Sequence, residues 1–188
     1  MDWNKGIRRS ILAGIYISLA GLVFLKIGGI LGAILFSFGL LGVIHTGSLL
    51  YTGRIYWEKN ILVLLIILFG NILGCILVGS IVSYIYPELR ETAEIIINSR
   101  INDTIPAILL KGSFCGLIMT TAVIGSHENN WYPLLIGIPL FILSGFYHSI
   151  ADAFYFVLSP KLDYLIPWIC IVLGNWIGGK LYFLWTVK

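Results

Sequence analysis

Apolar runs of about 20 residues recur along the whole chain and limit what it can fold into. A helical run of that length crosses a hydrocarbon core about 30 Å thick. Only 11% of the residues are charged, whereas a soluble domain has about 25%. The sequence therefore predicts an all-α membrane protein, with one transmembrane domain over residues 1–188.

Six spans fit the sequence, and short polar stretches separate most of them. The first apolar run lacks a cleavage-site pattern, so we expect it to be a membrane helix rather than a signal peptide. The only long connector lies between the third and fourth spans and is polar. We place the spans at about 8–28, 30–54, 58–86, 106–126, 131–159 and 162–186.

The basic residues predict the orientation of the chain in a cell membrane. With six spans both termini share one side, and the side richer in lysine and arginine is expected to be cytoplasmic. The terminal side has the larger set, so we expect cytoplasmic termini. Its set is Lys5, Arg8, Arg9, Arg54, Lys59 and Lys188, and the opposite set is Lys26, Arg90, Arg100 and Lys161.

Several classes of partner have no support. The net charge is only +3, and no basic cluster accompanies a soluble surface, which argues against a nucleic-acid partner. The three cysteines lie in apolar runs without metal-ligand spacing, so we expect neither a metal nor another cofactor. Membrane lipid is the expected surrounding.

The chain contains an internal repeat. The segment LFGNILGCIL at 68–77 reappears as VLGNWIGGKL at 172–181, with a shared G-N-x-x-G. Two further matches join the first span to the fourth and the second to the fifth. They pair Arg9 and Gly14 with Lys111 and Gly116, and Thr46-Gly47 with Ser144-Gly145, so the three offsets are 104, 102 and 98 residues.

The repeat predicts two three-span halves, at about 8–86 and 106–186. Because three is odd, the halves insert with opposite orientation, which is an architecture of transporters and channels. Each middle span carries a small polar break, at Thr46 or Ser144. Such a break is tolerated at membrane depth only beside protein or a water-filled cavity. We therefore expect the second and fifth spans to be interrupted and to line a pathway.

Two ionisable residues follow the second break, in SGFYHSIADAF at 144–154. A polar group at this depth tends to face a cavity or a partner. His148 would offer a passing anion a proton or a positive field, or it would simply bond between helices. Asp152 lies four residues later, on the same face of a helix. It would either act on His148 or bond a backbone amide.

Four motifs together resemble the formate/nitrite transporter family over residues 8–186. They are FSFGLLGVIHTGSLLYTG at 36–53, PLFILSGFYHSIADAFYF at 139–156, and the two G-N-x-x-G segments. The resemblance implies a homopentamer of six-helix protomers with an aquaporin-like fold. Each protomer would have its own pore for a small monovalent anion or its conjugate acid, such as formate, nitrite, hydrosulfide or lactate.

The resemblance also implies roles for single residues. Phe36, Leu40 and Phe141 match residues that narrow the family's pore. Thr52 matches the threonine that faces the central histidine, here His148. Arg100 falls near the position of a lysine in the family's outer vestibule.

The chain departs from the family pattern at three positions. Tyr147 stands where a glutamate usually precedes the histidine, and Asp152 stands where asparagine is usual. Leu49 occupies a position that is usually acidic. These departures bear on the substrate and on proton coupling rather than on the fold.

Three functions remain open from the sequence. The first is a passive or proton-linked channel for a small monovalent anion. The second is a membrane enzyme that uses His148 and Asp152 as an acid–base pair, although no nucleophile or nucleotide motif accompanies them. The third is a structural membrane protein, which would leave the polar breaks unexplained.

Overall fold

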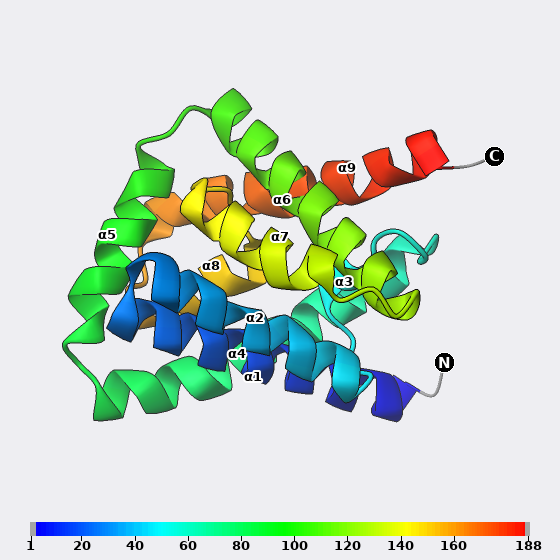
Figure 1. Cartoon of the computed structure of the whole chain (residues 1–188). Helices are drawn as coiled ribbons and strands as arrows, with labels where there is room; N and C mark the ends of the chain where they lie inside the picture. The colour runs from blue at the N-terminus through cyan, green and yellow to red at the C-terminus, as the bar shows by residue number, and fades with distance from the viewer. Residues whose placement is uncertain (1–2, 187–188) are drawn as a thin grey trace.

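A computed structural model describes residues 3–186, in which all the regular secondary structure is helical (Figure 1). The helices begin and end as follows: α1 Trp3–Ile27, α2 Gly29–His45, α3 Tyr51–Arg54, α4 Ile61–Ile85, α5 Leu89–Ile101, α6 Ile105–His127, α7 Tyr132–Leu143, α8 Ser149–Leu158, the 3-10 turn η1 Leu162–Tyr164, and α9 Leu165–Thr186.

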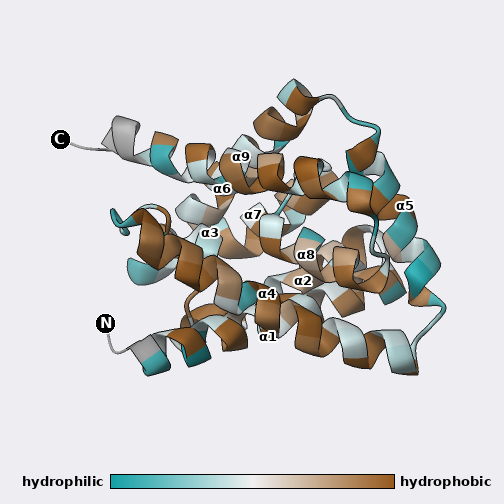
Figure 2. Ribbon diagram, turned by 180° about the vertical axis from the view of Figure 1, so that it is seen from behind, coloured by the Kyte–Doolittle hydropathy of each residue, from teal (hydrophilic) through white to brown (hydrophobic). Residues whose placement is uncertain are grey.

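The helices form two groups that follow the two halves of the chain. Helix α1 packs against α4 and α2, and α6 packs against α9 and α7. Two short helices cross between the groups, since α3 contacts α6 and α8 contacts α4. The start of α1 and the end of α9 lie at one end of the bundle, and α5 covers the other (Figures 1 and 2). We call these the terminal end and the α5 end.

Four of the six expected spans are helices long and apolar enough to cross a membrane. They lie at Asn4–Ile27, Ile61–Ile85, Ile105–His127 and Leu162–Tyr182. The second expected span consists of α2 and α3 with residues 46–50 between them, and the fifth consists of α7 and α8 with residues 144–148 between them. The chain is therefore a helical membrane protein.

The polar connector contains a helix that the sequence analysis did not predict. Helix α5 occupies 13 residues of it and buries Leu89, Ala93 and Ile97 against the bundle. Lys161 fastens the outer side of α5, because its Nζ lies 2.7 Å from Glu94 Oε1 and donates to Asn98 Oδ1 at 2.8 Å. This fastening holds α5 across one end of the protein.

The outward faces of the long helices are apolar, as lipid requires. Along α4, Leu62 and Phe69 are exposed, and Tyr84 is 89% exposed near its end. Figure 2 shows hydrophobic residues along the outside of the bundle and more hydrophilic ones on α5. Several of the polar side chains buried inside the bundle lie at or beside the two interruptions, among them Ser48, Thr52, His148 and Ser149.

Glycines allow two helix pairs to approach at backbone distance. A Cβ atom on Gly14 of α1 would collide with the Asn71 carbonyl of α4, and one on Gly116 of α6 would collide with the Asn175 carbonyl of α9. Gly178 on α9 faces the Ser113 carbonyl in the same way. Close approach through small residues is the usual means of packing helices in lipid.

We expect Gly178→Ala to destabilise the protein, because the new methyl group meets the Ser113 carbonyl rather than a flexible side chain. Overpacking of this kind costs about 1–3 kcal/mol. Thermal unfolding in detergent should show a lower Tm than the wild type. Gly53→Ala is the matched control, because its Cβ would make ordinary contact with Val123 at 3.4 Å. Equal Tm values for the two variants would contradict the packing described here.

Candidate functional site

The two interrupted segments begin with the same backbone turn. Gly47 and Gly145 have φ values of 65° and 68°, a left-handed conformation that residues with a Cβ rarely adopt. The residue after each glycine donates back to a carbonyl of the preceding helix. Ser48 N donates to Val43 O at 2.9 Å, and Phe146 N donates to Phe141 O at 3.0 Å.

Two buried asparagines satisfy the backbone of these segments. Asn71 donates from Nδ2 to Leu49 O and Ser10 O, each at 2.8 Å, and its Oδ1 accepts from Tyr51 N at 2.8 Å. Its three partners thus come from α1, from the first interruption and from α3. Asn71, and Asn175 described next, are the asparagines of the two G-N-x-x-G segments.

Asn175 makes the equivalent three bonds in the second half. Its Nδ2 donates to Tyr147 O at 2.8 Å and to Gly112 O at 2.9 Å, and its Oδ1 accepts from Ser149 N at 2.8 Å. Each asparagine therefore fastens one interruption to two long helices. The sequence predicts that both asparagines bond across helices, and the structure adds that their partners include the backbone of the two interruptions.

Thr52 and His148 meet at the centre of the protein. Both are buried, and Thr52 Oγ1 lies 3.0 Å from His148 Nε2. His148 also caps α8, because its Nδ1 accepts from Ala151 N at 3.1 Å. A neutral imidazole with an accepting Nδ1 carries its proton on Nε2. Nε2–H therefore donates to Thr52, whose own hydroxyl proton stays available for another acceptor.

A cavity of about 150 Å³ reaches this centre from the α5 end. Phe36 and Phe141 line it, with ring centroids 6.1 Å apart in an edge-to-face arrangement, and Phe141 stacks on His148 at 5.8 Å. Both phenylalanines are 3% exposed. The structure thus brings two of the predicted pore residues, both apolar, together beside His148.

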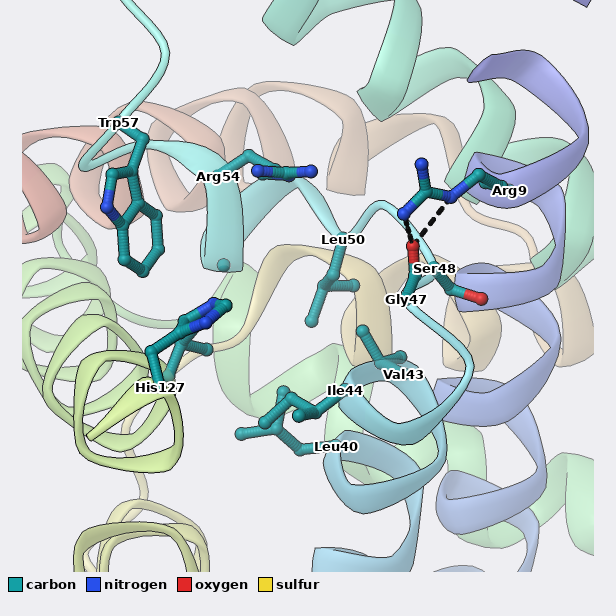
Figure 3. Close-up of a pocket in the computed structure, with 12 residues that line it drawn as sticks. Arg9, Leu40, Val43, Ile44, Gly47, Ser48, Leu50, Arg54, Trp57 and His127 are labelled. Carbon is teal, nitrogen blue, oxygen red and sulfur yellow. Dashed lines mark hydrogen bonds between the residues drawn. The ribbon is translucent and has the colours of Figure 1, made fainter. Parts of the chain in front are cut away.

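A second cavity, of about 140 Å³, opens toward the terminal end (Figure 3). Leu40, one helical turn after Phe36 on α2, forms part of its wall. Leu50 and Gly53 line it as well and flank Thr52 along the chain. The Thr52–His148 hydrogen bond therefore joins the walls of the two cavities. The other lining residues include Arg9, Ser48, Arg54, Trp57 and His127.

Arg100 and Asp152 form a largely buried ion pair at the α5-end cavity. Arg100 Nε lies 3.3 Å from Asp152 Oδ1, and the side chains are 16% and 1% exposed. The guanidinium also lies 4.3 Å above the Tyr147 ring, a cation–π distance. Asp152 thus joins Arg100 rather than His148, and two residues that depart from the family pattern meet the same arginine.

The Tyr164 hydroxyl is a second polar neighbour of the Asp152 carboxyl. This hydroxyl and Asp152 Oδ2 are both buried, and the two side chains interact. No side-chain hydrogen bond joins Asp152 to His148 in this part of the chain, because both ring nitrogens of His148 have other partners. The two residues are linked through the backbone, where Asp152 N donates to His148 O at 2.9 Å.

A polar network at the start of α6 holds Tyr147 in place. Lys111 Nζ donates to Asp103 Oδ2 at 2.6 Å and to the Tyr147 hydroxyl at 3.1 Å, and that hydroxyl donates to Asp103 Oδ2 at 2.7 Å. The hydrogen bond from Lys111, followed by that from Tyr147, lowers the pKa of Asp103 below its usual value. Asp103 was not predicted from the sequence, because Tyr147, one of its two partners, lies 44 positions away.

Thr46 and Ser144 lie at the interruptions, as the sequence analysis predicted, but their side chains line neither cavity. Thr46 Oγ1 donates to Gly42 O at 2.7 Å and lies 2.7 Å from Ser48 Oγ. Ser144 is exposed, and its backbone N–H ends α7 by donating to Leu140 O.

Within the described residues, no group of His, Cys, Asp and Glu side chains is arranged to hold a metal ion.

Two interrupted helix pairs around a buried histidine define a helical membrane protein with a polar centre, and comparison with known proteins gives its family. The sequence matches the formate/nitrite transporter family over residues 1–187. The chain belongs to this family, which confirms the resemblance noted from the motifs. A comparison with curated protein sequences found no significant match.

Solved structures share the fold. A structure described as a pentameric formate channel with formate bound aligns with a TM-score of 0.84 and 21% identity, over 96% of this chain and 94% of the other. A structure described as an FNT family ion channel aligns with a TM-score of 0.89 and 18% identity, over 100% of this chain and 92% of the other.

We expect Asn71→Ala and Asn175→Ala to destabilise the protein by similar amounts, because each removes three hydrogen bonds, and the two sets are equivalent. A buried backbone group left unpaired costs about 1–3 kcal/mol. Thermal unfolding in detergent measures the loss, and Asn102→Ala at an exposed position is the control. A Tm unchanged in either variant would contradict the fastening role.

The Asp103 network should depend on pH in a defined direction. A carboxyl group whose pKa is lowered on folding stabilises the protein above its unfolded pKa, which is about 3.9, and loses this effect as pH falls through the folded value. We therefore expect Asp103→Asn to lower Tm equally at pH 8 and pH 5, and progressively less below about pH 4. A difference that grows on acidification would contradict this assignment.

Proposed function

We propose that this protein conducts a small monovalent anion, or its conjugate acid, through a path between the two cavities. Formate, nitrite and hydrosulfide represent the substrate class. Family membership supports transport of this kind. The observation that carries the proposal is the Thr52–His148 pair, buried between two cavities that approach it from opposite ends.

The constriction favours a neutral form of the substrate. Phe36, Leu40 and Phe141 offer a passing group no hydrogen bond, so a charged anion would pay the full desolvation penalty there. His148 and Thr52 lie beside this barrier. The Thr52 hydroxyl can donate to an anion oxygen, and the donating Nε2–H of His148 orients that hydroxyl.

Proton transfer at His148 would involve Nε2. Its Nδ1 is occupied by the Ala151 N–H, and a doubly protonated ring would have to give up that cap. A neutral histidine that donates from Nε2 thus fits this geometry. Whether a proton accompanies the anion is the further question that flux measurements address.

The repeat and the assembly are part of the same proposal. The matched hydrogen bonds of Asn71 and Asn175 support an inverted three-plus-three repeat with interrupted second and fifth spans. We propose a homopentamer in the cell membrane, by analogy with the solved structure described as a pentameric formate channel. The excess of basic residues at the terminal end supports cytoplasmic termini.

An enzyme based on His148 and Asp152 has less support. Both His148 nitrogens have other partners, and the Asp152 carboxylate pairs with Arg100. An acid–base pair would need both groups to reach one substrate atom. Product formation without anion flux would favour the enzyme over the channel.

We expect purified protein in liposomes to accelerate entry of formate, nitrite or hydrosulfide over empty liposomes, measured with an entrapped pH or anion indicator. His148→Phe should lower flux several-fold, because one hydrogen bond contributes about 0.5–1.5 kcal/mol, and should change its pH dependence, since a titratable group leaves the path.

His45→Phe is the matched control, because His45 is exposed and lines neither of the two cavities. No acceleration of any of the three anions by the wild type would contradict the channel proposal. Equal pH profiles for the wild type and His148→Phe would remove His148 from the proton chemistry.

A further inference from the structure

The two cavities differ in whether an acidic side chain pairs with their arginines. At the α5 end, Arg100 is paired with Asp152, and both line the cavity. At the terminal end, Arg9 and Arg54 line the cavity, and no acidic residue is among the described residues of its wall. The terminal-end cavity is therefore the more positive of the two.

The two arginines of this cavity are not equivalent. Arg9 is committed to the protein, because its Nε donates to Gly47 O at 2.6 Å and its Nη2 donates to the same oxygen (Figure 3). The Arg54 guanidinium has no hydrogen bond or ion pair within residues 3–186. Figure 3 shows it at the rim of the cavity, between Trp57 and Arg9, with no dashed line to another group.

The neighbouring charged residues leave the hydrogen-bond donors of Arg54 unpaired within residues 3–186. Arg9 repels it and Glu58 attracts it. Glu58 lies outside the cavity wall, and one of its carboxylate oxygens accepts from Asn60 N at 2.9 Å. A half-buried guanidinium with unused donors facing a cavity has the chemistry of an anion ligand.

We propose that Arg54 binds the transported anion at the terminal-end cavity, through two parallel hydrogen bonds to a planar anion with two oxygens. Such a fork matches a carboxylate or nitrite and does not match hydrosulfide, which has one acceptor atom. The inference rests on the proposed function and narrows its substrate class to formate-like and nitrite-like anions.

The cavity suits a small ligand of this kind. Its volume is about 140 Å³, and Leu40 and Leu50 in its wall make further entry as a free anion costly. Ser48 and His127 add polar residues to the same wall. An anion bound here would lie on the terminal-end side of Thr52, at the point before it takes up a proton and becomes neutral.

Formate flux into liposomes, measured against concentration, tests the site. We expect Arg54→Gln to raise the half-saturating formate concentration at least about tenfold, since charge-assisted hydrogen bonds are the stronger ones. Arg54→Lys keeps the charge but not the fork, so it should raise the value for formate and nitrite and leave that for hydrosulfide near wild type.

Arg8→Gln is the matched control. Arg8 is exposed on α1 at the same end and does not line the cavity. It removes the same charge from the same end of the protein, so it should leave all three values near wild type. A rise equal to that of Arg54→Gln would mean that surface potential acts rather than a site, and would overturn the inference.

Saturation-transfer NMR on the formate proton gives a readout that does not need transport. Detergent-solubilised wild type and Arg8→Gln should transfer saturation to formate, and Arg54→Gln should transfer far less. Unchanged transfer and unchanged half-saturation in Arg54→Gln overturn the inference and leave the channel standing. Wild-type binding that requires Arg54, without any flux, supports the site and contradicts the proposed function.

Discussion

The structure depends on satisfying backbone hydrogen bonds where two helices stop inside the bundle. Each interruption frees N–H and C=O groups that lipid cannot bond. Asn71 and Asn175 take up these groups from the neighbouring long helices, with three bonds each. Arg9 holds the first of these segments as well, because its guanidinium donates to Gly47 O and its own carbonyl accepts from Leu49 N. Thr52 lies two residues after the first segment ends, and His148 is the last residue of the second, so these two side-chain amides also help to position the centre of the protein.

Charged side chains lie near this centre, and they are neutralised by forming ion pairs. Asp152 is nearly inaccessible and yet carries a carboxylate, which would repel an anion if it stood alone. Its pairing with Arg100 removes most of that field from the α5-end cavity. Tyr147, placed by Asp103 and Lys111, supports the same guanidinium from its ring face. At the α5-end cavity, an aspartate and a tyrosine thus stand where the family pattern has other residues.

Much of the scaffold could be predicted from the sequence, and much of the charge arrangement could not. Hydropathy located the long spans, and Thr46-Gly47 and Ser144-Gly145 located the interruptions, because these signals are local. Helix α5 escaped prediction since its composition is polar and its apolar side shows only in packing. The spacing of His148 and Asp152 suggested a shared helical face, and both residues line the α5-end cavity. His148 caps α8 from an extended backbone conformation, however, and its ring bonds Thr52 and Ala151 rather than Asp152. Arg100 reaches Asp152 from 52 positions away, a distance that no local pattern encodes.

The glycine contacts have a mechanical consequence. At Gly14 and Gly74 between α1 and α4, and at Gly116 and Gly178 between α6 and α9, the paired backbones lie too close for an added methyl group. Sliding one helix of a pair along the other would bring residues with a Cβ to these points and force them against the partner's backbone. The paired helices are therefore held in one register, which leaves adjustment of the interior to side chains and to the loops at the ends of the bundle.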